Sequence, residues 1–250
     1  MGTNGADDRI EREKQFHDDI YASRGREGLS FFYPAETTMR AAYEEQILSG
    51  CTGKRVLEYG CGLGSYAFEL TARKARVTGI DISHVAIDYA QRTAADRGLT
   101  IDFRVMNAES LDFPDGAFDL VCGSGILHHL NLETALDQIR RVLAPGGKGV
   151  FVEPLGHNLV INGFRRLTPQ LRTRDEHPLT DIDLAMIRGK FPGVQITPYY
   201  LFAIAAFGVR PRSLYPAISK GLELLDAAAF SIFPRLAKYA WQILLVLRKS

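Results

Sequence analysis

The pattern of apolar and polar positions changes in character near residue 55. Before it, apolar residues recur at helical spacing, as at Phe16, Ile20 and Tyr21, and Pro34 separates the helices predicted on either side. After it, short apolar runs alternate with amphipathic segments, which predicts strands alternating with helices. The polar first 15 residues predict a frayed terminus.

Five strands and three helices are expected in the alternating region. Alternation of this kind favours an α/β fold, in which a parallel sheet carries helices on both faces. Right-handed crossovers between parallel strands then leave few possible topologies. The strands are predicted at residues 55–59, 76–80, 101–105, 118–123 and 148–153, and the helices at 65–73, 85–96 and 132–142.

The last hundred residues depart from simple alternation. They predict helices at 159–167, 184–190 and 222–236, and strands at 194–203 and 241–248. We therefore expect one domain in three parts: an N-terminal helical cap (1–50), a core (51–153), and acceptor-side loops with the last two strands (154–250).

Composition narrows the class of protein. The net charge of +1 gives no global field that favours nucleic acid. Three cysteines provide neither a disulfide framework nor a metal-ligand spacing, so we expect a reducing cytoplasm and no metal. The N-terminus lacks the apolar core of a signal peptide, and no apolar run is long enough to span a bilayer.

The most informative segment is a glycine-rich turn that follows the first predicted strand. Gly60, Gly62 and Gly64 follow a Gly-x-Gly-x-Gly spacing, whereas the dinucleotide fingerprint is Gly-x-Gly-x-x-Gly. Glu58 precedes the turn, and its carboxylate would repel a pyrophosphate but favour a cationic ligand. Asp81 ends the second strand, 23 positions after Glu58, where a carboxylate can accept hydrogen bonds from a ribose diol.

Together these residues resemble the first motifs of class I S-adenosylmethionine-dependent methyltransferases. The resemblance continues through residues 107–111, 113–121, 123–130 and 143–148, and it covers about 56–153. Asn107 stands where that family usually has Asp.

The resemblance implies a Rossmann-like, mostly parallel, seven-stranded sheet. Its last strand would insert antiparallel beside the fifth, after a helical insertion. The implied cofactor is S-adenosyl-L-methionine, which becomes S-adenosyl-L-homocysteine. Its expected contacts are Glu58, Gly60, Cys61, Gly62, Gly64, Asp81, Ile82, Asn107, Ala108, Ser124 and His129.

Candidate catalytic residues follow the fourth and fifth strands, because ligands bind at the carboxyl ends of parallel strands. We expect His129, Glu153 and His157 to contact the acceptor, either as a general base or by positioning the acceptor. The alternatives are a purely positioning role for the histidines and a helix cap formed by Asn158.

Several segments outside the glycine-rich turn are candidates to select the acceptor. Phe31, Phe32 and Tyr33 are candidates to close over the cofactor. Residues 172–178 form either a lid or a solvated loop, and Arg165 and Arg166 either bind a carboxylate or lie on the surface. The apolar and basic insertion 208–240 contacts a membrane or apolar substrate, forms a dimer interface, or covers the sheet.

The expected function is methyl transfer from S-adenosylmethionine to a small-molecule acceptor in biosynthetic or secondary metabolism, by a monomer or homodimer. Alternatives are a lipid or membrane-associated acceptor, and an enzyme that uses S-adenosylmethionine without methyl transfer. A nucleic-acid or protein acceptor is less favoured, because no basic stripe interleaved with aromatics is present. The glycine spacing and Glu58 disfavour a nicotinamide-dependent oxidoreductase.

Overall fold

The fold is a seven-stranded mixed sheet with helices on both faces. The computed structural model describes residues 5–23, 37–208 and 214–249. The sheet has the order β3-β2-β1-β4-β5-β7-β6. Its first five strands are parallel, and β7 runs antiparallel to both β5 and β6. The strands are β1 (Arg55–Tyr59), β2 (Arg76–Asp81), β3 (Asp102–Val105), β4 (Phe118–Ser124), β5 (Leu143–Pro154), β6 (Gln195–Tyr199) and β7 (Gln242–Arg248).

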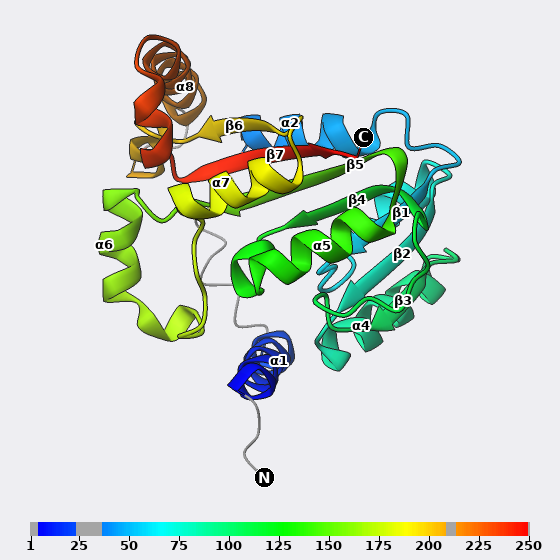
Figure 1. Ribbon diagram of the computed structural model, residues 1–250. Coiled ribbons are helices and arrows are strands. Elements are labelled where there is room, and N and C mark those ends of the chain that lie inside the picture. Colours follow the sequence, from blue (N-terminus) through cyan, green and yellow to red (C-terminus); the bar gives the residue numbers. More distant parts are fainter. Residues whose placement is uncertain (1–4, 24–36, 209–213, 250) are drawn as a thin grey trace.

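Helices cover the sheet because each presents an apolar face to it. In Figure 1, α5 and α7 lie in front of the sheet, and α2 lies behind it. Buried residues of α5 and α7 pack in one core cluster, whereas those of α2, α3 and α4 pack in a second. The helices are α1 (Gly5–Ser23), α2 (Thr37–Leu48), α3 (Ala67–Ala72), α4 (His84–Asp96), α5 (Leu132–Val142), α6 (Leu159–Leu167), α7 (Asp181–Lys190) and α8 (Tyr215–Ile232).

This arrangement confirms the predicted fold class, including the antiparallel last strand and the helical insertion before it. Helix α8 lies in that insertion and projects beyond the edge of the sheet (Figure 1). Among the residues described, no helix combines the length and the apolar character that crossing a bilayer requires.

The expectation of a frayed N-terminus is wrong for the described part of the first 15 residues. Helix α1 begins at Gly5, and polar contacts hold it against the core. Arg9 donates to the carbonyl oxygen of His129 at 2.8 Å and pairs with Glu109. Asp18 accepts from the Ser83 hydroxyl at the start of α4. These partners are remote in sequence, so local polarity could not reveal them.

The sixth strand is shorter than predicted. The expected segment 194–203 is extended only over Gln195–Tyr199. Tyr200 adopts a φ of 64°, which turns the chain away from the sheet. The Asp226 carboxylate of α8 then accepts from the backbone amides of Leu201, Phe202 and Ala203. A contact from α8 therefore ends the strand.

Candidate active site

The turn after β1 has a backbone shape that requires glycine. Gly60, Gly62 and Gly64 have φ values of 74°, 51° and 93°, in the region that side-chain-bearing residues avoid. A Cβ on Gly60 would lie 2.8 Å from Cγ1 of Ile126. The turn can therefore keep its path only without side chains at these positions.

Asp81, at the end of β2, is fixed beside this turn. One carboxylate oxygen accepts from the backbone N–H of Gly62 at 2.8 Å, and the other accepts from that of Ser83 at 2.9 Å. Both donors are backbone groups, so the carboxylate is held in one place. It remains part of the lining of a cavity at the carboxyl ends of the strands.

This cavity, of about 70 Å³, is called the donor cavity here. Several of the predicted cofactor residues meet at its surface. Four others, Glu58, Cys61, Gly62 and Gly64, are outside its lining. Those that line it are Gly60, Asp81, Ile82, Asn107, Ala108, Ser124 and His129.

Glu58 has a different position from the one expected for a cofactor contact. Its carboxylate is 3% exposed and accepts from the backbone amides of Tyr66 at 2.7 Å and Ala67 at 2.8 Å. Burial raises the pKa of Glu58 to about 7, although these two donors lower it. The residue therefore joins β1 to the first turn of α3.

The segment after β3 forms another wall of the donor cavity. The side-chain oxygen of Asn107 accepts from the backbone N–H of Glu109 at 2.9 Å, which folds the chain into a turn. The Tyr59 hydroxyl donates to the carbonyl oxygen of Ala108. These bonds fix the two residues that were expected to face adenine.

Helix α1 supplies donor-cavity residues that sequence reasoning missed. Ile10, Glu13, His17 and Tyr21 line the cavity, together with Arg9. Their spacing of three, four and four positions puts them on one face of the helix. That spacing was the available signal, but the stripe mixes apolar and charged residues and so resembles a solvated face.

Among these residues, Glu13 forms polar contacts with several other side chains. Burial raises its pKa, but hydrogen bonds from His129, His17 and Thr173 outweigh burial and hold the pKa well below its usual range. Its carboxylate lies 3.1 Å from Nδ1 of His129. The donor cavity therefore contains a fixed negative charge where α1 meets the loop after β4.

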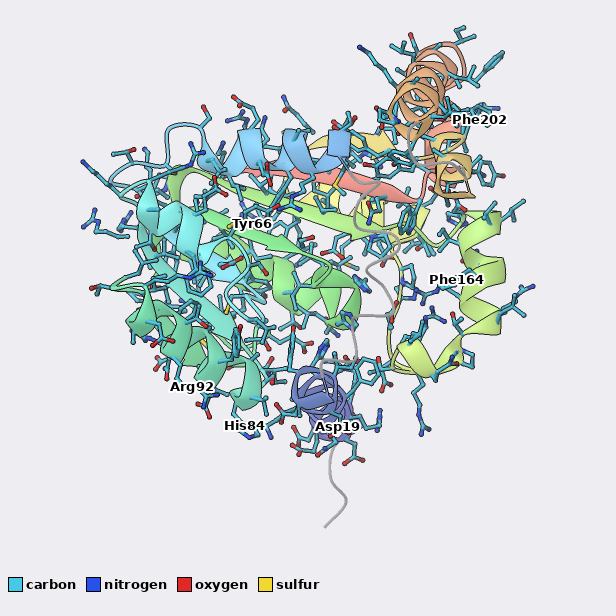
Figure 2. All side chains as sticks on the ribbon, turned by 180° about the vertical axis from the view of Figure 1, so that it is seen from behind. Asp19, Tyr66, His84, Arg92, Phe164 and Phe202 are labelled. Atoms are coloured by element: carbon cyan, nitrogen blue, oxygen red, sulfur yellow. The ribbon has the colours of Figure 1, made fainter. Side chains whose placement is uncertain are left out.

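A second cavity, of about 280 Å³, adjoins the first and is called the acceptor cavity here. The two share Ser124, Gly125 and His129. In Figure 2, Phe164 lies between α6 and the body of the sheet, consistent with its place in the lining. The remaining lining residues are apolar (Phe16, Ile20, Val152, Pro154, Ile161, Leu171, Trp241) or polar (His128, Arg165, Arg172, Glu176, Gln242).

Glu153 lies beneath the acceptor cavity instead of inside it. The side chain is fully buried and accepts from the backbone amides of Ile126 and Leu127, at 3.0 and 2.8 Å. Its second oxygen is 2.7 Å from Nδ1 of His128. Glu153 therefore fixes the loop after β4 and orients His128, in place of the direct acceptor contact expected.

His157 does not reach either cavity. It lies outside the lining of both, and its Nε2 is buried with no hydrogen-bond partner among the described residues. The neighbouring Asn158 accepts from the backbone N–H of Ile161 at 3.0 Å and so caps α6. The helix-cap alternative thus describes this loop, whereas the expected contact of His157 with an acceptor has no geometric support. Residues 31–33, expected to close over the cofactor, lie outside the described residues.

Comparisons with known proteins agree with this geometry. Residues 56–147 match a family model described as a methyltransferase domain. The chain is 41% identical over 103 residues to the demethylmenaquinone methyltransferase of Thermus thermophilus, covering 40% of this chain and 47% of that protein. It is 34% identical over 146 residues to aklanonic acid methyltransferase of a Streptomyces species, covering 56% and 64%. The chain thus matches less than two thirds of either relative.

A solved structure extends the likeness beyond the matched segment. The [4+2]-cyclase SpnF superposes with a TM-score of 0.55 at 26% identity, covering 82% of this chain and 78% of that one. The match to the methyltransferase model covers the glycine turn, and the strand order is that of a Rossmann-like sheet. Residues 56–147 therefore match a methyltransferase domain, and the sheet that contains them has the class I, Rossmann-like fold.

Proposed function

We propose that this protein transfers a methyl group from S-adenosylmethionine to a small-molecule acceptor in biosynthetic metabolism. The observation that carries the proposal is the junction of the two cavities at Ser124, Gly125 and His129. A donor in the first cavity and an acceptor in the second would meet there. Methyl transfer is an in-line displacement, so such alignment supplies much of the rate.

The residues of the donor cavity fit the proposed cofactor. Asp81 suits the ribose hydroxyls, and Asn107 and Ala108 suit the adenine. Glu13 supplies negative charge toward a sulfonium, and Arg9, which is the only lysine or arginine among the described lining residues, is paired with Glu109. A pyrophosphate would therefore lack a free guanidinium or ammonium partner here. This supports S-adenosylmethionine over a dinucleotide.

The acceptor cavity supports a partly apolar small molecule with a polar group. Aromatic and aliphatic side chains form much of the lining, and His128, His129, Arg165 and Arg172 supply the polar positions. We assign direct contact with the reacting atoms to His129, because it belongs to both cavities. Glu153 is proposed as a positioning residue that acts through His128.

Calorimetry with S-adenosylmethionine, S-adenosylhomocysteine and NAD tests the cofactor first. We expect one equivalent of each of the first two to bind and NAD to fail. Acceptor screening with trideuteromethyl-labelled cofactor then follows, with a mass gain of the label in the product as the readout. Binding of NAD alone would overturn the proposal.

A second candidate is an enzyme that holds S-adenosylmethionine without transferring its methyl group. The neighbour named as a [4+2]-cyclase favours it, since that structure superposes on most of this chain. The labelled cofactor separates the two candidates. Product formation with no label and no S-adenosylhomocysteine would support the second.

The proposal also covers the form in which the acceptor is presented, either freely diffusing or carried by a lipid. Exposed apolar side chains on α6 and α8 support an alternative in which the acceptor is lipid-borne. No nucleic-acid partner is proposed, and a monomer or homodimer is expected. The buried, unpaired state of Cys51, Cys61 and Cys122 is consistent with the cytoplasm as the proposed compartment.

A further inference from the structure

We propose that His128, His129 and Glu176 form a binding site for a divalent transition-metal cation at the wall of the acceptor cavity. The three side chains are 9%, 11% and 10% exposed. Each can offer one ligand atom, and these atoms all lie within 4.8 Å of one another. Two imidazoles and a carboxylate are a donor set that suits zinc, iron and related ions.

Both imidazoles are already oriented as metal ligands usually are. Nδ1 of His128 is 2.7 Å from the buried Glu153 carboxylate, and Nδ1 of His129 is 3.1 Å from that of Glu13. A ligating histidine typically donates its other ring N–H to such a carboxylate, which fixes the tautomer. Here the contact of Nδ1 with a carboxylate leaves Nε2 of each ring as the ligand atom. Glu153 provides the carboxylate for His128, and Glu13 provides it for His129.

The spacing also leaves room for an ion. Nε2 of His128 is 3.8 Å from Oε1 of Glu176, too far for a hydrogen bond. Metal bonds of about 2.1 Å in a tetrahedral site put ligand atoms about 3.4 Å apart, so His128 and Glu176 would approach by about 0.4 Å, and no pair of ligand atoms would approach by more than about 1.4 Å. A second cluster, Glu13, His17 and His129, is less suitable, because Glu13 and His129 are already in hydrogen-bond contact.

Charge around the site favours an added cation. Glu13, Glu153 and Glu176 are carboxylates on or next to the imidazoles, whereas Arg165 and Arg172 are the arginines facing Glu176. Arg165 donates to Glu176 at 2.5 Å and so orients this carboxylate. The three carboxylates outnumber the two guanidinium groups, which leaves an excess of negative charge. Either a proton on an imidazole or a bound cation would neutralise that excess.

A cation held by three protein ligands keeps a coordination position open. Because the three residues line the acceptor cavity, that position would face the acceptor. A hydroxyl or carbonyl oxygen is the group it would take, and the cation would favour the ionised form of a hydroxyl. Cation binding itself needs neither cofactor nor acceptor, so the inference can fail while the proposed function stands, and the reverse.

Metal titration of the full chain, stripped with a chelator, tests the site. We expect one Zn²⁺ per chain to bind against a competing chelator, Mg²⁺ to bind at least about 100-fold more weakly, and Co²⁺ to give a visible absorption spectrum of low coordination number. Glu176→Gln and His129→Ala are expected to weaken Zn²⁺ binding at least about tenfold. Glu13→Gln, which removes only the carboxylate behind His129, should weaken it by a similar factor.

His84→Ala is the matched control, because His84 is an exposed imidazole 3.1 Å from Asp18. It should bind Zn²⁺ like the unaltered chain. The thermal unfolding midpoint of each variant, compared with that of the unaltered chain, reports that it is folded. Absence of stoichiometric Zn²⁺ binding, or binding that survives both Glu176→Gln and His129→Ala, would overturn the proposal and leave a proton as the compensating charge.

Discussion

Asp81 shows how a single carboxylate can serve both the fold and a ligand. Its two oxygens hold the Gly62 and Ser83 amides, and the residue also lines the donor cavity. We expect Asp81→Asn to weaken S-adenosylhomocysteine binding by about 10- to 100-fold, because a charged acceptor is lost. Calorimetry measures this. Asp88→Asn, at an exposed position of α4, is the control, and equal affinities for the two variants would remove Asp81 from the site.

Glu58 gives a pH-dependent prediction at the same scale. Burial raises its pKa from 4.5 to about 7, so the folded state holds a proton that the unfolded chain releases. This contribution to stability is complete below pH 4.5 and is lost as the pH rises through 7. From pH 5 to pH 8 it amounts to about 2 to 3 kcal/mol.

Glu58→Gln removes that titration, so the variant should gain about 2 to 3 kcal/mol relative to the unaltered chain between pH 5 and pH 8. Urea denaturation at several pH values measures the free energy of unfolding of both. A constant difference between the two proteins across this range would show that Glu58 titrates normally. The difference between proteins is informative because it cancels groups such as Asp18 and Asp183, whose pKa values are lowered.

At the scale of elements, the core of the fold is predictable because its signals are local. Predicted and observed limits agree for the helices Leu132–Val142 and Leu159–Leu167, where apolar periodicity and Asn caps coincide. The predictions were wrong where a remote partner decides, as at the end of β6, set by Asp226, and along α1, held by Arg9. No local pattern contains those contacts.

The candidate site divides in the same way. Glycine spacing and strand ends led to Gly60, Asp81 and His129, because topology brings strand ends together. The same reasoning could not separate a residue inside the cavity from one behind it. Glu58 and Glu153 are each the penultimate residue of a strand, yet the carboxylates accept hydrogen bonds from backbone amides behind the cavities. Only the packed structure distinguishes these roles.

Helix α1 is the element on which both cavities depend. Arg9 ties it to the carbonyl of His129 and to Glu109, whereas Arg12 forms an exposed pair with Asp175. We expect Arg9→Ala to weaken S-adenosylhomocysteine binding about tenfold and to speed amide exchange in α1, since charged bonds in a partly buried site are lost. Arg12→Ala, an exposed pair on the same helix, should change affinity less than about twofold.

Calorimetry and hydrogen-exchange mass spectrometry measure the two effects together. Slower exchange in α1 on adding S-adenosylhomocysteine to the unaltered chain would accompany them, because the ligand would contact this helix. If Arg9→Ala and Arg12→Ala behave alike, α1 is not held through His129 and Glu109. The helix would then be a surface element with no part in binding.

At the scale of the whole molecule, the apolar surface gathers at one end. The helices α6 and α8 both lie at the end of the sheet where β6 ends and β7 begins, as Figure 1 shows. Leu224 and Leu225 on α8 are 65% and 50% exposed, and Leu167 on α6 is 82% exposed. Lys220 and Lys238 add positive charge in the same region. Because Arg165 and Phe164 of α6 line the acceptor cavity, this end is where a lipid-borne acceptor would enter.

Sedimentation with phosphatidylglycerol vesicles tests that arrangement. If the acceptor is lipid-borne, the protein should sediment with anionic vesicles, and Leu224→Ser with Leu225→Ser should reduce binding at least about tenfold, because each buried leucine contributes about 1.5 to 3 kcal/mol. Tyr89→Ser is the matched control, since Tyr89 is 48% exposed on α4, which packs on β2 and β3 at the opposite edge of the sheet from β6. Equal loss in the control would indicate non-specific adhesion. Absence of sedimentation by the unaltered chain would instead favour a freely diffusing acceptor, and α8 would then need another partner for its exposed leucines.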